Sequence, residues 1–230
     1  MERKAMMMSP DSYYEWYLKG KSQEQIKSAI RGLKNEIGHL KNVMEHPDYG
    51  KEIIMHPSEA VRLWCARLYL ERAKEALVEA GGIYTPSQAE LKAKDFEENI
   101  QHISKVIFSI GGFHGGYETY TMNLTGEHLR INTEHSLVIE PNNLFDESDF
   151  PMSKDDFLDK IRELHIGEWR KSYTTRRFGY TVCDGTQWEL EIYFSNMYKP
   201  VKIYGDNAYP YNFDELQKLF GIDNDEHEDE

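Results

Sequence analysis

Cysteine and long apolar runs are scarce in this sequence. Only Cys65 and Cys183 occur in 230 residues, too few for a disulfide framework, so we expect two reduced thiols in a reducing compartment. No run of about 18 apolar residues is present, so no transmembrane helix is expected. The N-terminal residues also lack the apolar segment of a secretory signal. These absences predict a cytoplasmic protein that does not enter a membrane.

Motifs for catalysis and metal binding are also lacking. There is no Gly-x-Ser-x-Gly elbow, and neither cysteine has the flanking pattern of a thiol enzyme. His128 and His135 lie beside Glu127 and Glu134, but their spacing across a strand and a turn does not force these side chains together as metal ligands. We therefore predict no catalytic residue, metal or cofactor. An enzyme of unrecognised type remains the alternative.

Negative charge is concentrated in the second part of the chain. Residues 1–100 carry 15 Lys and Arg against 16 Asp and Glu, a net of −1, whereas residues 101–230 carry 12 against 24, a net of −12. Direct binding of duplex nucleic acid needs a basic surface, so it is not expected of residues 101–230. A partner protein with a basic surface fits this charge, and solubility alone is the alternative explanation.

The first 100 residues have helical periodicity. Ser22 and Gln25 form a capping-box pattern, which predicts a helix over residues 23–45. A second helix is expected over 58–80, and shorter helices over 11–19 and 88–99. The apolar residues of the helix at 23–45 are spaced as in a coiled coil: Ile26, Ile30, Leu33, Ile37, Leu40 and Met44. This region, 1–100, is predicted to contain an antiparallel, coiled-coil-like helical hairpin.

From Ile103 onwards the apolar period changes to two, which indicates strands. The strands are expected at 103–110, 117–124, 127–133, 136–140, 178–183, 186–194 and 200–204, with helices at 153–164 and 213–220. Asp184-Gly185 suits a tight turn, so 178–183 and 186–194 are predicted to form a hairpin. The class is α+β, with an antiparallel sheet and inserted helices over 101–222. Six acidic residues fall within 223–230, which is predicted to be a disordered tail.

Two segments of the acidic region are candidate binding surfaces. The first is a basic island with interspersed aromatic residues, formed by Arg170, Lys171, Arg176 and Arg177, a combination that can hold phosphate or single-stranded nucleic acid. Its alternative role is to neutralise nearby carboxylates. The second is a tyrosine-rich loop containing Tyr204, Asp206, Asn207, Tyr209 and Tyr211, which suits an interface. Its alternative role is to seal the edge of the core.

A glycine-rich turn at 111–116 is a further candidate. Phosphate-binding loops place converging backbone N–H groups before a helix, whereas here a strand follows and the turn contains no Lys or Arg. The turn is therefore interpreted as the tip of a hairpin, with His114 exposed. Glu118 is a nominal partner that could make His114 a general base.

The segments 13–17, 111–117 and 184–190 together resemble uncharacterised accessory proteins of anaerobic Gram-positive bacteria. The resemblance implies no activity, and it implies carriage on mobile elements. From the residues we predict a non-enzymatic protein-interaction module, an acidic inhibitor or antagonist of a basic nucleic-acid-binding protein. The alternatives are an unrecognised enzyme and a nucleotide- or metabolite-binding module that uses the histidines and the Arg176/Arg177 island.

Overall fold

A computed structural model describes residues 7–51, 56–112, 115–126, 128–136, 148–182 and 184–222. The chain forms two compact units, Met1–Pro86 and Ser87–Glu230, called the first and second units below. The boundary therefore falls before the predicted helix at 88–99, whereas the sequence analysis placed it after residue 100. Among the described residues, no helix has the length and apolar character needed to cross a membrane.

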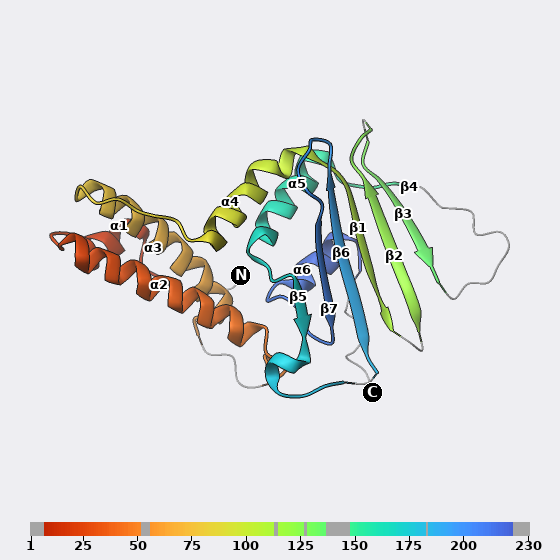
Figure 1. Ribbon diagram of the computed structural model, residues 1–230, viewed down its shortest axis with the longest axis horizontal. Coiled ribbons are helices and arrows are strands. Elements are labelled where there is room, and N and C mark those ends of the chain that lie inside the picture. The colour runs from red at the N-terminus through yellow and green to blue at the C-terminus, as the bar shows by residue number, and fades with distance from the viewer. Residues whose placement is uncertain are drawn as a thin grey trace. The chain divides into compact units, whose positions relative to one another are not determined.

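The described residues of the first unit form four helical segments (Figure 1): α1 (Pro10–Tyr13), a π-helical turn (Tyr14–Leu18), α2 (Gln23–Met44) and α3 (Glu59–Glu79). Ser22 and Gln25 form the predicted capping box at the start of α2. Ser58 caps α3 by accepting a hydrogen bond from the Val61 amide. These side chains satisfy amide groups that have no partner in the first turn of a helix.

The core of the first unit lies between α2 and α3. Its buried members are Leu18, Ile26, Ile30, Leu70, Ala73, Ala76 and Leu77. Gln23, at the start of α2, donates a hydrogen bond of 2.8 Å to the carbonyl of Ala80, just beyond the end of α3. An ion pair of 2.6 Å joins Arg62 of α3 to Glu36 of α2. Small alanine side chains on α3 let the two backbones approach closely.

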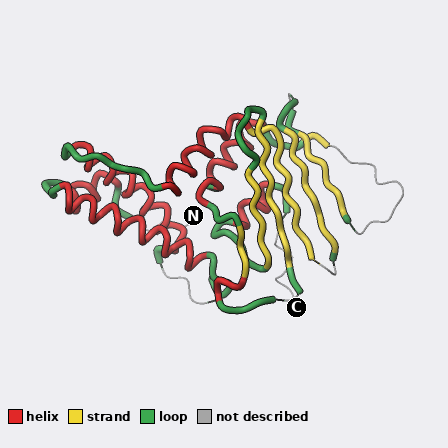
Figure 2. The backbone as a smooth tube through the Cα atoms, in the orientation of Figure 1, coloured by secondary structure: helices red, strands yellow, loops and turns green. Residues whose placement is uncertain are grey.

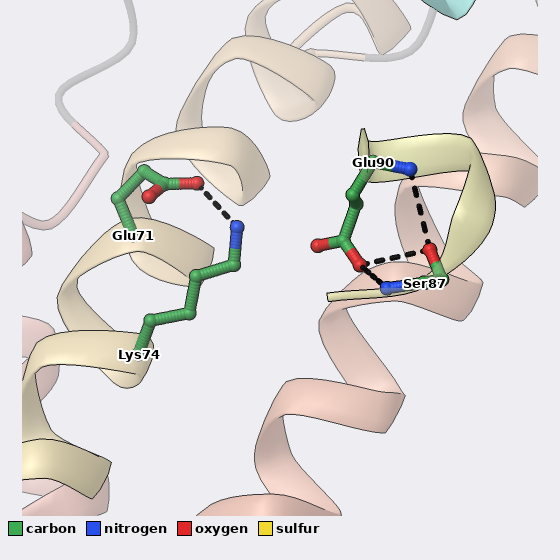
Figure 3. A network of polar contacts seen from close by, with 4 residues as sticks. All are labelled: Glu71, Lys74, Ser87 and Glu90. Carbon is green, nitrogen blue, oxygen red and sulfur yellow. Dashed lines mark hydrogen bonds and ion pairs between the residues drawn. The ribbon is translucent and has the colours of Figure 1, made fainter. Parts of the chain in front are cut away.

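A second face of α3 packs against the N-terminal segment. Tyr69 stacks on Tyr13, with 4.4 Å between the ring centroids, and its hydroxyl donates to the Met8 carbonyl at 2.6 Å. The solvent side of α3 carries ion pairs, such as Lys74 with Glu71 at 2.8 Å (Figure 3). Burial on two faces therefore explains why α3 contains many apolar residues without a single apolar stripe.

The second unit begins with α4 (Gln88–Asn99), which opens on a capping box formed by Ser87 and Glu90 (Figure 3). Phe96 of α4 and Ile100, which follows it, are buried in the core of this unit. That burial is why α4 belongs with the sheet. Strand β1 starts three residues later, at Ile103.

A sheet of seven strands in the order β4-β3-β2-β1-β6-β7-β5 forms the centre of the second unit, within the part of the chain that the structure describes. The strands are β1 (Ile103–Gly112), β2 (Gly116–Asn123), β3 (Arg130–His135), β4 (Ser148–Asp149), β5 (Ser172–Thr174), β6 (Thr186–Phe194) and β7 (Val201–Asp206). The mixed α+β class is therefore confirmed. The sheet is not wholly antiparallel, because β5 runs parallel to β7.

The predicted hairpin of 178–183 with 186–194 is wrong. β6 has β1 on one side and β7 on the other, so no edge of it is left for residues 178–182. Thr175–Phe178 instead forms a 3-10 turn after β5. Of the predicted strand at 136–140, residues 137–140 lie outside the described residues, as do Cys183 and the tail at 223–230.

Helices α4, α5 (Lys154–Glu163) and α6 (Phe213–Leu219) all cover one face of the sheet (Figures 1 and 2). The side chains that the strands direct to this face are apolar and buried, among them Val106, Phe108, Leu190, Ile192 and Ile203. Asn212 precedes α6 but makes no capping bond. Its side chain donates to the Leu164 carbonyl at 2.9 Å instead, which ties the start of α6 to the end of α5.

Candidate binding pocket on the open face of the sheet

The opposite face of the sheet carries mostly polar side chains, because alternate residues of a strand point to opposite faces. Strand register places these residues in two neighbouring rows across β2, β1, β6, β7 and β5. The Glu189 row consists of Thr119, Ser109, Glu189, Tyr204 and Ser172, and the Gln187 row consists of Tyr117, Gly111, Gln187, Asp206 and Thr174. Both rows belong to the side of the sheet that faces away from the buried core.

A pocket of about 680 Å³ lies over these two rows. It is lined by Ser109, Tyr117, Thr119, Thr174, Thr175, Arg176, Thr181, Gln187, Trp188, Glu189, Tyr204, Gly205 and Asp206. Its volume is within the range of about 300–1,000 Å³ found for sites of small organic ligands. Most of its lining residues carry a hydroxyl, amide or charged group, so the pocket offers hydrogen bonds to a polar ligand.

Hydrogen bonds between strands hold the β1–β2 end of the pocket. The hydroxyls of Ser109 and Thr119 are 3.0 Å apart, and the Tyr117 hydroxyl donates to Oε1 of Gln187 at 2.5 Å. Gly111 lies between Tyr117 and Gln187 in their row. Since Gly111 has no side chain, the tyrosine can reach across β1 to the glutamine of β6.

Asp206 is held in place by the residue that follows it. Asn207 has a backbone φ of 51° and uses its side chain twice: Nδ2 donates to Oδ1 of Asp206 at 2.6 Å, and Oδ1 accepts from the Thr186 amide at 2.9 Å. Among the described residues no cation pairs with Asp206, whereas Glu189 in the neighbouring row interacts with Glu191 and with the charge of Lys202. Asp206 is therefore free to accept hydrogen bonds from a ligand.

Arg176 supplies the positive charge of the pocket. It lies in the 3-10 turn directly after β5, is exposed, and forms no ion pair with any described carboxylate. Arg177 differs, because its guanidinium lies over the Phe178 ring, 4.9 Å from the centroid, and it does not line the pocket. One of two adjacent arginines is thus placed to bind an anionic group within the pocket.

The structure divides the predicted basic island. Arg170 and Lys171 precede β5, whereas Arg176 and Arg177 follow it. Lys171 lies near Lys92 of α4, whose pKa is lowered by burial and by the charge of Lys171. Lys92 also donates to the Trp169 carbonyl at 3.4 Å. The four basic residues therefore lie at the two ends of β5, and of them only Arg176 lines the pocket.

The predicted tyrosine cluster is divided as well. Tyr204 is 55% exposed and lines the pocket. Tyr209 packs on Phe213, with 4.7 Å between ring centroids, and burial raises the pKa of its hydroxyl. Tyr211 packs against the same core. Tyr209 and Tyr211 therefore have the alternative role considered for this loop, which is to seal the core.

Trp188 forms part of the floor of the pocket. Its indole N–H donates to the Ala208 carbonyl at 3.0 Å. A Cβ atom at position 205 would overlap this indole ring and the same carbonyl, so the site requires Gly205. Gly205 lets β7 pass close to the Trp188 ring. Its chain neighbours Tyr204 and Asp206 both line the pocket.

Glu191, the next outward residue of β6 after Glu189, is neutralised. Lys202 pairs with it at 2.7 Å, and the Tyr193 hydroxyl also donates to it. Burial alone would raise the pKa of Glu191, but the hydrogen bonds from Lys202 and Tyr193 outweigh burial and lower it. Glu191 and Lys202 lie outside the pocket lining, but both interact with Glu189, which lines it.

The histidines do not converge on this pocket. His114 lies outside the described residues, and His128 is exposed. Glu118, the nominal partner of His114, accepts a hydrogen bond of 2.5 Å from Tyr120 and pairs with His135 at 3.3 Å. Burial is the main cause that raises the pKa of Tyr120, and the hydrogen bond to Glu118 raises it further. No group of three possible metal ligands occurs among the described residues.

Of the predicted binding residues, Arg176, Tyr204 and Asp206 meet in the pocket. Sequence reasoning did not identify Ser109, Thr119, Gln187 and Glu189, which complete it. These residues occupy the polar positions of the period-two pattern in β1, β2 and β6, and this pattern was the only sign of them in the sequence. That pattern marks a solvent-facing strand surface, but it does not say which strands are neighbours.

Comparison with known proteins gives no match: no protein-family model, no curated protein and no solved structure matches the chain.

Proposed function

We propose that this protein is a binding module that takes a polar organic ligand into the pocket on the open face of its sheet. The observation that carries the proposal is the pocket of about 680 Å³, in which Arg176 and Asp206, neither of which has an ion-pair partner among the described residues, meet Glu189 and exposed Tyr204. Charged groups without partners in a concave site gain most from a ligand of complementary charge.

The composition of the lining favours binding over catalysis. Among the described residues that line the pocket there is no histidine, cysteine or lysine. Glu189 lies directly opposite Ser109 in the strand register, but among the described lining residues no histidine activates a serine or threonine hydroxyl as a nucleophile. A non-enzymatic role is therefore the simpler proposal.

Filling the pocket tests this function. We expect Thr119→Trp to place an indole ring in the pocket, whereas Thr121→Trp, at the next outward position of β2, lies outside its lining. The three proteins are incubated with small molecules extracted from the source organism and examined by native mass spectrometry. Wild type and Thr121→Trp should retain the same ligand, and Thr119→Trp should lose it. Equal retention by all three, or by none, would refute the proposal.

The charge of the sequence favours a second candidate, an interaction module that antagonises a basic nucleic-acid-binding protein. Residues 101–230 carry a net charge of −12. The open face of the sheet does not concentrate this charge, since the four cations Lys105, Arg130, Arg176 and Lys202 offset most of the charge of the five carboxylates there, which are Glu134, Asp149, Glu189, Glu191 and Asp206. We propose the partner-binding role, carriage on a mobile element, a cytoplasmic location and the coiled-coil-like pairing of α2 with α3 as hypotheses to be tested separately.

Salt dependence tests this second candidate. Exposed charges are screened over about 8–10 Å at physiological ionic strength, so added salt should slow association with a basic partner. Deleting residues 223–230 removes six carboxylates and should weaken the association modestly. A partner whose association rate depends on neither change would refute the electrostatic mechanism.

A further inference from the structure

The charges and polar groups of the pocket follow a definite order across the sheet. Arg176 lies at the β5 end, Asp206 on β7 and Glu189 on β6 are in the middle, and Ser109 and Thr119 are at the β1–β2 end. Neighbouring strands are about 4.8 Å apart, so these five strands span about 19 Å. A ligand that fills this length meets a cation first, then two carboxylates, and then neutral polar groups.

The cationic end selects an anionic group. A guanidinium presents a planar fork of donors that matches phosphate or carboxylate oxygens. Arg176 has no ion-pair partner among the described residues, so binding an anion does not require an existing pair to break. Among the described lining residues, Arg176 is the one cation, and Asp206 and Glu189 are the two carboxylates. A single phosphate is therefore favoured over a chain of phosphates.

The middle of the pocket selects hydrogen-bond donors. Oδ1 of Asp206 accepts a hydrogen bond from Asn207 at 2.6 Å, whereas Oδ2 accepts none from the residues that the structure describes. Carboxylates repel anions and accept from hydroxyl groups. An acidic side chain that binds ribose hydroxyls is the arrangement used by dinucleotide-binding proteins. A sugar with adjacent hydroxyls next to the phosphate would satisfy Asp206 and Glu189.

The far end suits a planar polar ring. Gln187, Ser109 and Thr119 offer both donors and acceptors, and the ring of Tyr117 on β2 lines the pocket beside them. Aromatic side chains stack on nucleobases with a gain of about 1–3 kcal/mol per base. From this order we propose that the ligand is a ribonucleoside monophosphate, with its phosphate on Arg176, its ribose at Asp206 and Glu189, and its base near Tyr117 and Gln187. This inference rests on the proposed binding function.

Calorimetric titration of the full chain without divalent cations tests the proposal. The probes are AMP, GMP, CMP and UMP, with adenosine, ribose 5-phosphate and inorganic phosphate as partial ligands. At least one monophosphate should bind more tightly than its nucleoside and than ribose 5-phosphate, and its triphosphate should bind more weakly. Equal binding of ribose 5-phosphate would overturn the assignment of the base, and equal binding of the nucleoside would overturn the assignment of the phosphate.

Adjacent arginines provide a matched pair of variants. Arg176→Gln should weaken binding of the monophosphate about 10- to 100-fold, the range for a lost hydrogen bond to a charged group. Arg177→Gln should change it by less than about twofold, because Arg177 lies over Phe178 outside the lining. Equal losses in both variants would contradict the specific role of Arg176.

The contact with the sugar is tested by comparing the affinities for a ribonucleotide and for its 2′-deoxyribonucleotide. Wild type should prefer the ribonucleotide to the 2′-deoxyribonucleotide, and Asp206→Asn should lose that preference, whereas Asp214→Asn on exposed α6 should keep it. A ratio of affinities is insensitive to a general loss of folded protein. If no nucleotide binds while an extracted ligand is still lost from Thr119→Trp, this inference fails and the proposed function stands. If nothing binds the pocket at all, both fail.

Discussion

Phe108 offers a direct test of which face of the sheet is covered. Its side chain is 0% exposed and lies among aromatic rings, with centroid distances of 5.3 Å to Phe220 and 5.9 Å to Phe213. Phe108→Ala removes this packing and leaves a cavity, which costs about 3–5 kcal/mol in protein cores. The whole free energy of unfolding of a domain is about 5–15 kcal/mol, so this single change removes a large part of it.

Ile107, the next residue of β1, supplies the control. It points to the open face, where it pairs with Thr121 and Glu191 and is half-buried. Ile107→Ala should cost only about 1 kcal/mol, the span of strand propensity. At about 2–4 °C per kcal/mol, the melting temperature should fall by roughly 6–20 °C for Phe108→Ala and by a few degrees for Ile107→Ala.

Urea titration followed by tryptophan fluorescence measures this difference. Trp169 and Trp188 are buried in the second unit, whereas Trp16 and Trp64 of the first unit are largely exposed. The emission change on unfolding therefore reports mainly on the second unit. If Ile107→Ala destabilised the protein as much as Phe108→Ala, both faces of the sheet would be covered, and the pocket would not be open to a ligand.

Three further predictions concern stability. Leu70→Asp, which places an unpaired charge at a site that is 8% exposed, should abolish cooperative unfolding of the first unit by circular dichroism, whereas Glu75→Asp on the same helix should not. Ser87→Ala should cost about 1 kcal/mol, because it removes the cap of α4, and an unchanged urea midpoint would contradict this role. Glu191 has a lowered pKa, so it stabilises the fold above its ordinary value of 4.5 and loses this contribution as pH falls through the lower value of the folded state. The stability difference between wild type and Glu191→Gln should therefore shrink below pH 4.5, and a constant difference down to acid unfolding would refute the assignment.

Local patterns in the sequence predicted most of the helices and strands. The Ser22–Gln25 capping box marked the start of α2, and the period-two pattern marked β1 and β2. Such signals involve residues close together in the chain, where capping bonds and alternation act. The mixed α+β class followed from the order of these elements.

Pairing of distant segments could not be predicted in the same way. Asp184-Gly185 suggested a hairpin, but β6 pairs with β1, about 80 residues earlier in the chain, and with β7. The parallel pairing of β5 with β7 likewise depends on tertiary packing around buried Tyr173. The sequence could therefore suggest Arg176, Tyr204 and Asp206, but it could not place them beside Ser109 and Thr119.

The central claim is that the open face of the sheet is the recognition surface. Amide chemical-shift mapping of the isotope-labelled full chain, titrated with the ligand that native mass spectrometry identifies, tests it most directly. The largest shifts are predicted for Ser109, Thr119, Glu189 and Asp206, with little change in α4 and α5, which cover the other face. Shifts that instead cluster on α4 and α5, or within residues 7–51 of the first unit, would contradict the account.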